Sequence, residues 1–328
     1  MNYRTLGKTG FKISEISLGT WQVGGKWGEM FDDRNAELII NEAIDRGVNF
    51  IDTADVYSGG LSEAAVAKVV KSRKERVYVA TKCGRKISPH TTEGYTTSVL
   101  RKFVEDSLKN MKTDTLDLIQ LHCPPTEVFY RDDIFEIFDR LKEEGKILNL
   151  GVSVEKVEEA LKAINYPNVT TVQIVFNLFR QKPAEIFFRE ASLKNIGVIV
   201  RVPLASGLLT GKFSKDTHFD KKDHRFFNRN GEAFDKGETF SGIPYEYGLE
   251  AVEELKKLFP QYENLAPLAL KWILSFKEVS TIIPGASSPD QVISNLSVFE
   301  LSEITGEQMS EINKIYEKFI KKYVHNLW

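Results

Sequence analysis

Apolar residues along the chain occur in short runs that alternate with longer segments of helical periodicity. Short apolar runs bounded by turn residues are typical of buried parallel strands. Eight runs predict strands, at residues 16–18, 49–51, 77–80, 116–121, 148–152, 172–175, 198–202 and 281–283. Amphipathic stripes between them predict helices at residues 36–46, 63–70, 99–111, 134–144, 157–164 and 184–195. The pattern therefore indicates parallel strands connected by helices.

The order of these elements predicts the fold class. Parallel strands joined by helices use right-handed crossovers, and eight such units close a barrel more naturally than an open sheet. We therefore expect an α/β fold, a (β/α)8 TIM barrel that forms one domain over residues 1–328. An open doubly wound sheet is the alternative. Ahead of the first strand, residues 3–6 and 11–13 flank a glycine-containing turn, which predicts an N-terminal β-hairpin.

The part of the chain after the seventh predicted strand is less regular. Residues 214–247 are polar and aromatic without a clear period, which is typical of either a mobile lid or a binding loop. Helical patterns follow at residues 249–259 and 267–276. After the eighth strand, a helix near Gln291 and a last helix at residues 307–324 are predicted. The barrel is thus expected to carry a long loop and extra C-terminal helices.

Composition narrows the class of partner. Of the 328 residues, 42% are hydrophobic and 27% are charged, with a formal net charge of -2, as in soluble globular proteins. Lys and Arg are scattered among Asp and Glu, so neither nucleic acid nor an anionic membrane is expected as a partner. We find no signal-peptide pattern and no apolar stretch of roughly 18 residues. We expect a small-molecule ligand and a monomer or weak homo-oligomer.

Common metal, disulfide and nucleotide motifs do not occur. Cys83 and Cys123 are the two cysteines, too few for a disulfide framework and not spaced as a zinc site. We therefore expect no metal and a reduced, cytoplasmic setting. The chain has no Gly-x-Gly-x-x-Gly, so a Rossmann site is not predicted. The segment from Gly207 to Lys212 misses a Walker loop by one residue.

Ionisable side chains follow three consecutive predicted strands. Asp52 follows the second strand, Lys82 the third and His122 the fourth, while Tyr57 lies one short loop after Asp52. The carboxyl ends of barrel strands face the active site. Taken singly, Asp52 could be a helix cap, Tyr57 an aromatic lid residue and His122 a core histidine. A lysine that closes a buried strand is costly unless a carboxylate pairs with it, and Asp52 is the candidate.

These four side chains suit the reduction of a carbonyl group. Hydride addition needs a proton donor near the developing alkoxide, and a tyrosine with a pKa of about 10 is too weak an acid unless its anion is stabilised. Lys82 held by Asp52 would favour the tyrosinate, so Tyr57 is the predicted proton donor. A neutral His122 would orient the carbonyl oxygen by hydrogen bonding.

Several sequence segments carry a family pattern. In chain order they are Gly19-Thr-Trp, Phe50-Ile-Asp-Thr-Ala-Asp-Val-Tyr, Thr81-Lys, Leu121-His-Cys-Pro, Gly151-Val-Ser, Pro203-Leu-Ala-Ser-Gly-Leu-Leu-Thr-Gly-Lys and Ile283-Pro-Gly-Ala-Ser-Ser-Pro-Asp-Gln. Over nearly the whole chain this resembles the aldo-keto reductase family, including its bacterial and channel beta-subunit-like members. The resemblance implies a (β/α)8 barrel, NADPH-linked reduction of aldehydes and ketones, and a catalytic tetrad that falls on Asp52, Tyr57, Lys82 and His122.

The same resemblance implies the residues that bind cofactor and substrate. Ser153 and Gln173 would hydrogen-bond the nicotinamide carboxamide. The other expected cofactor residues are Gly19, Thr20, Trp21 and Arg201 near the nicotinamide, Leu204, Ser206, Leu208, Gly211 and Lys212 along the pyrophosphate, and Gly285, Ser287, Gln291 and Asn295 at the adenosine. Asp52, Pro203 and Gly207 are also expected to contact the cofactor. The expected substrate pocket consists of Trp21, Trp27, Tyr57, His122 and Cys123, although such aromatic residues are as often core packing.

The chain departs from the family pattern at several of these positions. Val154 stands where many relatives have Asn, and Cys123 replaces a bulkier residue. Arg201 stands where many relatives stack an aromatic ring on the nicotinamide, and its planar guanidinium can stack in the same way. The run around Ser287 contains no Arg or Lys, which a 2′-phosphate would prefer. The resemblance makes NADP(H) the expected cofactor, while the missing cation near Ser287 leaves NAD(H) open.

Two other functions are compatible with the same residues. One is a nicotinamide-cofactor-binding redox sensor or regulatory subunit with slow catalysis. The other is a barrel isomerase or aldolase that forms a Schiff base through Lys82. A Lys82 held by Asp52 would resist Schiff-base formation, so the pairing of these two side chains distinguishes this alternative from a reductase.

Overall fold

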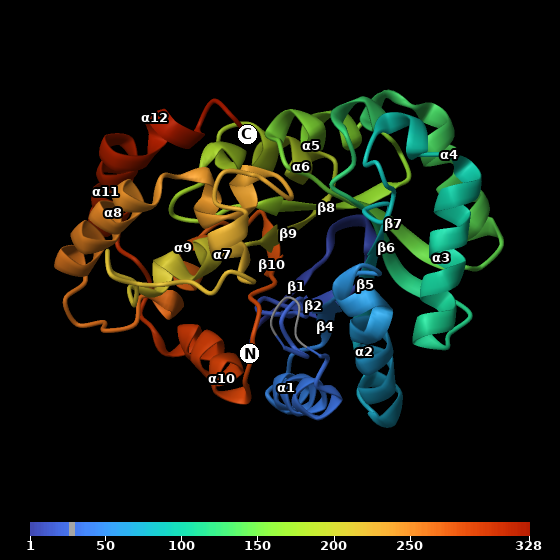
Figure 1. The fold of residues 1–328 in the computed structure, drawn as a ribbon, viewed down its shortest axis with the longest axis horizontal. Coiled ribbons are helices and arrows are strands. Elements are labelled where there is room, and N and C mark those ends of the chain that lie inside the picture. Colours follow the sequence, from blue (N-terminus) through green and yellow to red (C-terminus); the bar gives the residue numbers. More distant parts are fainter. Residues whose placement is uncertain (26–29) are drawn as a thin grey trace.

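Eight parallel strands form the centre of the molecule in the computed structural model, which describes residues 1–25 and 30–328 (Figure 1). They are β3 (Leu18–Gly19), β4 (Phe50–Asp52), β5 (Tyr78–Cys83), β6 (Leu116–His122), β7 (Ile147–Ser153), β8 (Val169–Val175), β9 (Gly197–Arg201) and β10 (Val279–Ile282). Strands consecutive in sequence are hydrogen-bonded neighbours. Parallel bridges from Ile16 to Ile282 and from Gly19 to Gly285 join the two edges. The fold is therefore a (β/α)8 barrel, as predicted, and not an open sheet.

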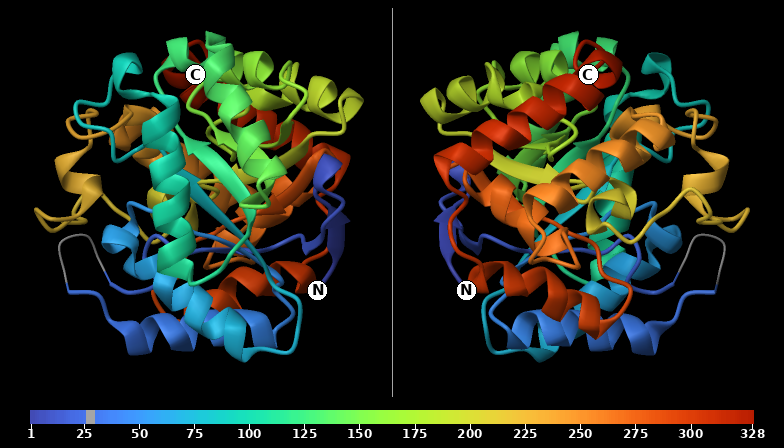
Figure 2. Two further views of the ribbon diagram at one scale, coloured as in Figure 1. Left: turned by 90° about the vertical axis from the view of Figure 1, so that its right-hand side faces the viewer. Right: turned by 90° about the vertical axis from the view of Figure 1, so that its left-hand side faces the viewer.

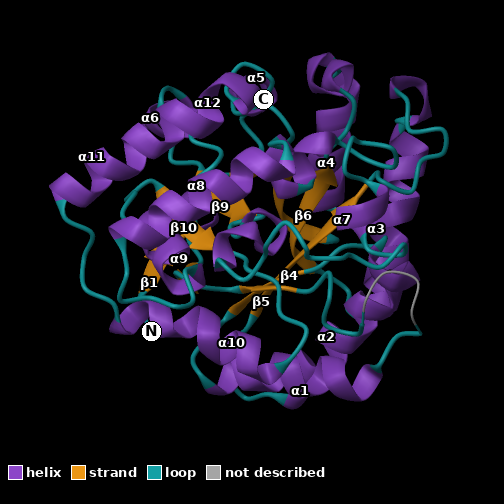
Figure 3. Cartoon of the chain, turned by 60° about the vertical axis from the view of Figure 1, so that its left-hand side comes forward, coloured by secondary structure: helices purple, strands orange, loops and turns teal. Residues whose placement is uncertain are grey.

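Helices enclose the barrel on its outside, and in Figure 3 they surround the orange strands. Between consecutive strands lie α1 (Asp33–Asp45), α2 (Leu61–Ser72), α3 (Thr97–Met111), α4 (Asp132–Glu143), α5 (Val157–Ala163) and α6 (Phe187–Leu193), with α8 (Tyr245–Leu258) and α9 (Ala266–Leu274) between β9 and β10. Each presents an apolar stripe to the sheet. In α4 the buried residues recur at helical spacing, from Ile134 to Leu141.

The predicted N-terminal hairpin is present and closes one end of the barrel. Strands β1 (Tyr3–Thr5) and β2 (Lys12–Ser14) pair antiparallel. Leu6 and Ile13 are fully buried, and they belong to one apolar cluster that fills the barrel interior with Phe50, Ala80, Leu118, Ile199 and Ile283. Figure 2 shows the hairpin and the long loop after β9 at opposite ends of the barrel. Only the carboxyl end of the barrel is therefore left for a site.

Some element boundaries differ from the sequence prediction. Strand β8 begins at Val169, and β9 ends at Arg201 because Val202 has a φ of 51°, a conformation that a β-branched residue does not adopt in a strand. The sixth predicted helix is shorter, because a 3-10 turn at Lys182–Ala184 precedes α6. Tertiary context decides such ends, while the periodicity decides only that an element exists.

The long loop after β9 contains only short helical pieces. They are α7 (His224–Phe227) and the 3-10 turns η7 (Lys236–Glu238) and η8 (Phe240–Gly242). After β10 come α10 (Pro289–Leu296), then α11 (Gly306–Ile315), a π-helical turn at Tyr316–Ile320 and α12 (Lys321–Val324) in place of the predicted last helix. Within the described residues, no helix is both long enough and apolar enough to span a membrane.

Candidate active site

The polar residues of the predicted tetrad lie one layer above the apolar interior of the barrel. Side chains of a strand alternate between the two faces of the sheet, so a residue two positions after an interior one also points inward. The interior residues Phe50, Ala80 and Leu118 are thus followed by Asp52, Lys82 and Gln120, and His122 is one further step toward the mouth. Lys82 pairs with Gln120, whereas Asp52 pairs with Ala80, two residues before Lys82. Neighbouring strands therefore bring these side chains together.

A buried ion pair forms the base of the site. Lys82 and Asp52 are each 1% exposed, and Lys82 Nζ donates to Asp52 Oδ1. The same ammonium donates to the Thr53 carbonyl oxygen at 2.8 Å and to the Tyr57 hydroxyl at 3.4 Å. Burial lowers the pKa of Lys82, but Asp52 and Tyr57 outweigh burial and the pKa lies above its ordinary value. Lys82 is consequently a fixed positive charge, which is a poor nucleophile for a Schiff base.

Two amide side chains hold the second oxygen of Asp52. Gln120 Nε2 donates to Asp52 Oδ2 at 2.9 Å and Gln173 Nε2 at 2.8 Å, and Gln173 also donates to Gln120 Oε1 at 3.2 Å. Gln173 was expected at the site, whereas Gln120 was missed. The available signal was its place in β6, where a polar residue stands midway between the inward-facing Leu118 and His122.

Tyr57 and His122 lie above this base, and both side chains are uncharged at neutral pH. Burial raises the pKa of Tyr57 above its ordinary value; Lys82 lowers the pKa, as predicted, but does not overcome burial, so Tyr57 is not the stronger acid that the sequence predicted. The phenol therefore keeps its proton at neutral pH. Burial and then Lys82 hold the pKa of His122 well below its ordinary value, so the imidazole is neutral. The two rings lie edge to face with centroids 6.1 Å apart, and the buried His122 Nδ1 has no hydrogen-bond partner among the described residues.

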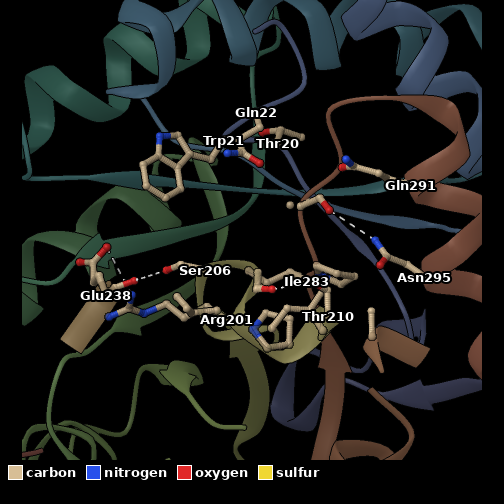
Figure 4. Close-up of a pocket in the computed structure, with 18 of the residues that line it drawn as sticks. Thr20, Trp21, Gln22, Arg201, Ser206, Thr210, Glu238, Ile283, Gln291 and Asn295 are labelled. Atoms are coloured by element: carbon tan, nitrogen blue, oxygen red, sulfur yellow. Dashed lines mark hydrogen bonds and ion pairs between the residues drawn. The ribbon is translucent and has the colours of Figure 1, made fainter. Parts of the chain in front are cut away.

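A cavity of about 390 Å³ extends from this pair along the mouth of the barrel (Figure 4). Of the sequence-predicted residues, those that line it are Gly19, Thr20, Trp21, Asp52, Tyr57, His122, Gln173, Arg201, Pro203, Leu204, Ser206, Gly207, Lys212, Gly285, Gln291 and Asn295. In Figure 4, Trp21 and Arg201 lie on one side of the cavity, and Gln291 and Asn295 on the other. The cavity thus connects the predicted catalytic, pyrophosphate and adenosine regions.

Other predicted residues lie behind the lining or beside it. The Ser153 hydroxyl donates to Gln173 Oε1 at 3.4 Å and contacts Cys123 Sγ, also at 3.4 Å. Both side chains are buried, and neither lines the cavity. The Leu208 side chain belongs to the hydrophobic core. Gly211 and Ser287 are not among the lining residues, and Trp27 lies outside the described residues.

The long loop supplies lining residues that sequence reasoning missed. His224, Arg225 and Glu238 all line the cavity. The His224 ring lies 4.9 Å from the Trp21 ring, and burial lowers the pKa of His224 to about 4, so this side chain is neutral. The sequence predicted only that residues 214–247 form a lid or a binding loop. It did not indicate which of their side chains reach the cavity, because the path of an irregular loop has no sequence periodicity.

Arg201 is tied into an ionic contact at the cavity wall. Its guanidinium is 2.7 Å from Glu155 Oε2 and 3.6 Å from Glu238 Oε2, and it donates to the Val154 carbonyl oxygen at 3.0 Å. Figure 4 shows this guanidinium directed toward Glu238. The positions of two departures from the family pattern, Val154 and Arg201, are therefore in direct contact.

Active sites of (β/α)8 barrel enzymes lie at the carboxyl ends of the strands, and the Lys82–Asp52 pair lies there beneath Tyr57. The family model described as "Aldo/keto reductase family" matches residues 15–317. The chain belongs to the aldo/keto reductase family. This membership implies an oxidoreductase that uses a nicotinamide cofactor to reduce the carbonyl group of a small molecule.

Individual relatives agree over nearly their whole length. "Aldo-keto reductase YhdN" of Bacillus subtilis (strain 168) is 31% identical, covering 98% of this chain and 95% of the relative. "Probable voltage-gated potassium channel subunit beta" of Oryza sativa subsp. japonica is 26% identical, with 98% of each chain covered. The solved structure of the glycerol dehydrogenase AKR11B4 from Gluconobacter oxydans superimposes with a TM-score of 0.77 at 29% identity, covering 97% of this chain and 96% of the other.

Proposed function

We propose that this protein reduces aldehydes or ketones to alcohols with NADPH, and that Tyr57 supplies the proton. The observation that carries the proposal is the Tyr57 hydroxyl, 3.4 Å from the Lys82 ammonium at the base of a cavity long enough to reach Lys212 and Asn295. A phenol beside a fixed cation in a pocket of this shape suits reduction better than hydrolysis, because no activated nucleophile faces the cavity among the described lining residues.

In the mechanism we propose, the chemistry that NADPH would contribute when bound is a hydride for the carbonyl carbon, and the residues of the chain do the rest. His122, as a neutral imidazole, donates a hydrogen bond to the carbonyl oxygen and fixes its position. Tyr57 transfers its proton to the oxygen as negative charge develops there. Lys82 stabilises the tyrosinate that remains, and Asp52 holds Lys82 within reach. Gln120 and Gln173 keep the Asp52 carboxylate in place during this step.

The lining residues have the chemistry that a dinucleotide requires. Gln173 offers an amide near the reacting end. Lys212 and Arg225 provide cations for the diphosphate beside the 3-10 turn at Ala205–Thr210. Within that turn Ser206 and Gly207 have positive φ, a backbone conformation that turns successive N–H groups toward an anion. At the far end, Gln291 and Asn295 offer amides to the adenosine. We therefore propose that these groups hold the cofactor.

We propose NADPH rather than NADH on the family resemblance. The choice is testable by fluorescence titration of both reduced cofactors, with tighter NADPH binding as the expected result. Equal dissociation constants would overturn this preference and leave the reductase activity untouched.

We also propose that the protein works in the cytoplasm, since Cys83 and Cys123 are buried and unpaired and free thiols persist in a reducing compartment.

The activity is tested by NADPH oxidation at 340 nm with a panel of aldehydes and ketones. The panel includes short hydroxylated carbonyl compounds, because a similar structure is that of a glycerol dehydrogenase. Tyr57→Phe should lower kcat by at least about a hundredfold, the size expected for loss of a general acid, with nearly unchanged cofactor affinity. Retention of most of the wild-type rate in this variant would refute the assignment of the proton donor.

A second candidate function is a nicotinamide-cofactor-binding regulatory subunit with slow catalysis. The observation that favours it is the full-length similarity to a probable potassium channel subunit beta. Tight cofactor binding together with negligible turnover on every carbonyl compound of the panel would support this candidate.

Borohydride trapping with the same compounds should leave Lys82 unmodified, since its ammonium is paired with Asp52.

A further inference from the structure

A closed ring of four charged side chains lies against the cavity wall. Arg201 is 2.7 Å from Glu155 and 3.6 Å from Glu238, and Arg85 is 3.8 Å from Glu155 and 3.5 Å from Glu238. Each cation thus contacts both anions, and with both glutamates ionised the ring has no net formal charge. All four side chains are largely buried, with exposures between 9% and 21%.

Four separate parts of the chain meet in this ring. Arg85 follows β5, Glu155 follows β7, Arg201 ends β9 and Glu238 ends η7 in the long loop. Two of the four, Arg201 and Glu238, line the cavity. The backbone around Glu238 is held independently of its carboxylate, because the Ser206 hydroxyl donates to the Glu238 carbonyl oxygen at 3.0 Å.

The register of the strands places Arg201 next to the reacting end of the cavity. In the pairing of β8 with β9, Gln173 lies beside Ile199 and Val175 lies beside Arg201. Arg201 is therefore two residues nearer the mouth of the barrel than Ile199, the partner of Gln173. Both side chains line the cavity together with Tyr57 and His122. A hydride donor that reaches a carbonyl held by Tyr57 would have to occupy this end, so a nicotinamide bound there would lie near the Arg201 guanidinium.

The two redox forms of the nicotinamide ring differ in charge. The reduced ring is neutral, and the oxidised ring carries one positive charge. In a partly desolvated pocket, a neighbouring charge acts strongly on the charged form and weakly on the neutral one. We propose that the Arg85–Glu155–Arg201–Glu238 ring is the charge balance that sets the relative affinity of this protein for oxidised and reduced cofactor. The inference rests on the proposed function and names how its cofactor site is tuned.

Single substitutions should move the affinity ratio in opposite directions. Arg201→Gln leaves the ring with one excess negative charge, so NADP⁺ should bind more tightly relative to NADPH. Glu238→Gln leaves one excess positive charge, so NADP⁺ should bind less tightly relative to NADPH. The double variant removes one charge of each sign and should return the ratio to the wild-type value. Each single change should be on the order of tenfold, the size of a charge contact at moderate effective dielectric.

The experiment is fluorescence titration of NADP⁺ and NADPH at pH 8, above the Glu155 pKa of about 7, against the wild type, both single variants and the double variant. Glu158→Gln is the matched control, because its carboxylate pairs with Lys182 and is 64% exposed. Glu155→Gln provides a second variant of excess positive charge, should Glu238→Gln fold poorly. Ratios that shift in the same direction in both single variants, or by less than twofold, would overturn the inference.

The outcome separates this inference from the proposed function. Turnover of the carbonyl panel by the wild type tests the reductase activity, whereas the affinity ratio tests the charge ring. A wild type that binds both cofactor forms without turnover would refute the reductase and still allow the ratio test. A wild type that binds neither form would refute both proposals.

Discussion

Lys82 and Asp52 form an ion pair in which each residue is 1% exposed, and the same lysine ammonium lies 3.4 Å from the Tyr57 hydroxyl. Burial of a charge pair is costly unless further hydrogen bonds satisfy both partners. Here the Thr53 carbonyl, Gln120 and Gln173 satisfy them. The buried ion pair therefore keeps the Lys82 ammonium fixed beneath the Tyr57 phenol.

Lys82→Met should remove the charge that stabilises the Tyr57 anion. We expect kcat to fall by about a hundredfold or more, since general acid catalysis of this kind contributes 10²–10⁴-fold. The variant also leaves Asp52 buried without its cation, so stability should fall by about 3–5 kcal/mol. Steady-state kinetics and urea unfolding measure the two effects. Lys68→Met, at an exposed lysine, is the control, and equal rates for the two variants would contradict the role of Lys82.

Gln120→Leu tests whether the second oxygen of Asp52 needs its amide partners. Gln120 is fully buried and lies 2.9 Å from Asp52 Oδ2, so its loss leaves Gln173 as the amide donor to that oxygen. We expect kcat to fall by about ten- to a hundredfold at unchanged KM, since the lost hydrogen bond to a charged group is worth about 1.5–3 kcal/mol. Gln120→Glu should be worse, because it places a second carboxylate beside Asp52. A change confined to KM would contradict a positioning role.

Asp55→Asn should change stability in a pH-dependent way. Burial raises the Asp55 pKa to about 7, against the opposing effect of the Lys86 ammonium 3.9 Å away. The folded state binds the Asp55 proton more tightly than the unfolded state does. The contribution of Asp55 to wild-type stability should therefore be most favourable below about pH 4 and should be lost as the pH rises to about 7. The Asn variant should therefore gain stability over the wild type at pH 8, by up to about 4 kcal/mol.

Urea unfolding of wild type and Asp55→Asn at pH 5 and pH 8 measures this difference. Asp216→Asn, at an exposed position, is the control and should show no such pH dependence. A gain for Asp55→Asn that is larger at pH 5 than at pH 8 would reverse the expected sign and refute the burial argument.

Glu155 should make oxidised-cofactor binding pH-dependent. Burial raises its pKa to about 7 against the opposing effect of Arg201, while Glu238 raises it further and Arg85 lowers it. At pH 8 the Glu155 carboxylate keeps the charge ring neutral, whereas at pH 6 protonation leaves one excess positive charge. NADP⁺ affinity should therefore weaken as the pH falls from 8 to 6. The Glu155→Gln variant is the control, because any pH dependence that comes from titration of the cofactor itself should be the same in both proteins. If NADP⁺ affinity depended on pH identically in the wild type and in this variant, Glu155 would not be the titrating group.

The periodicity of the sequence was sufficient to predict the barrel. Buried strands and amphipathic helices are local patterns, and their strict alternation leaves few topologies. The predicted strands and hairpin agree with β1 to β10 apart from boundaries such as that of β9, where Val202 takes a positive φ. The four predicted catalytic residues also lie together, because strand ends of a parallel barrel necessarily meet at one mouth.

What the sequence determined by itself was therefore the fold and the residues that end its strands. The tertiary structure decided which other side chains reach them. Gln120 required the inward alternation of β6 and the register with Lys82. Glu238 lies far along an irregular loop whose path depends on contacts such as that with Ser206. Such contacts join residues distant in sequence, and only packing of the whole chain brings their charges within a few ångströms of the cavity.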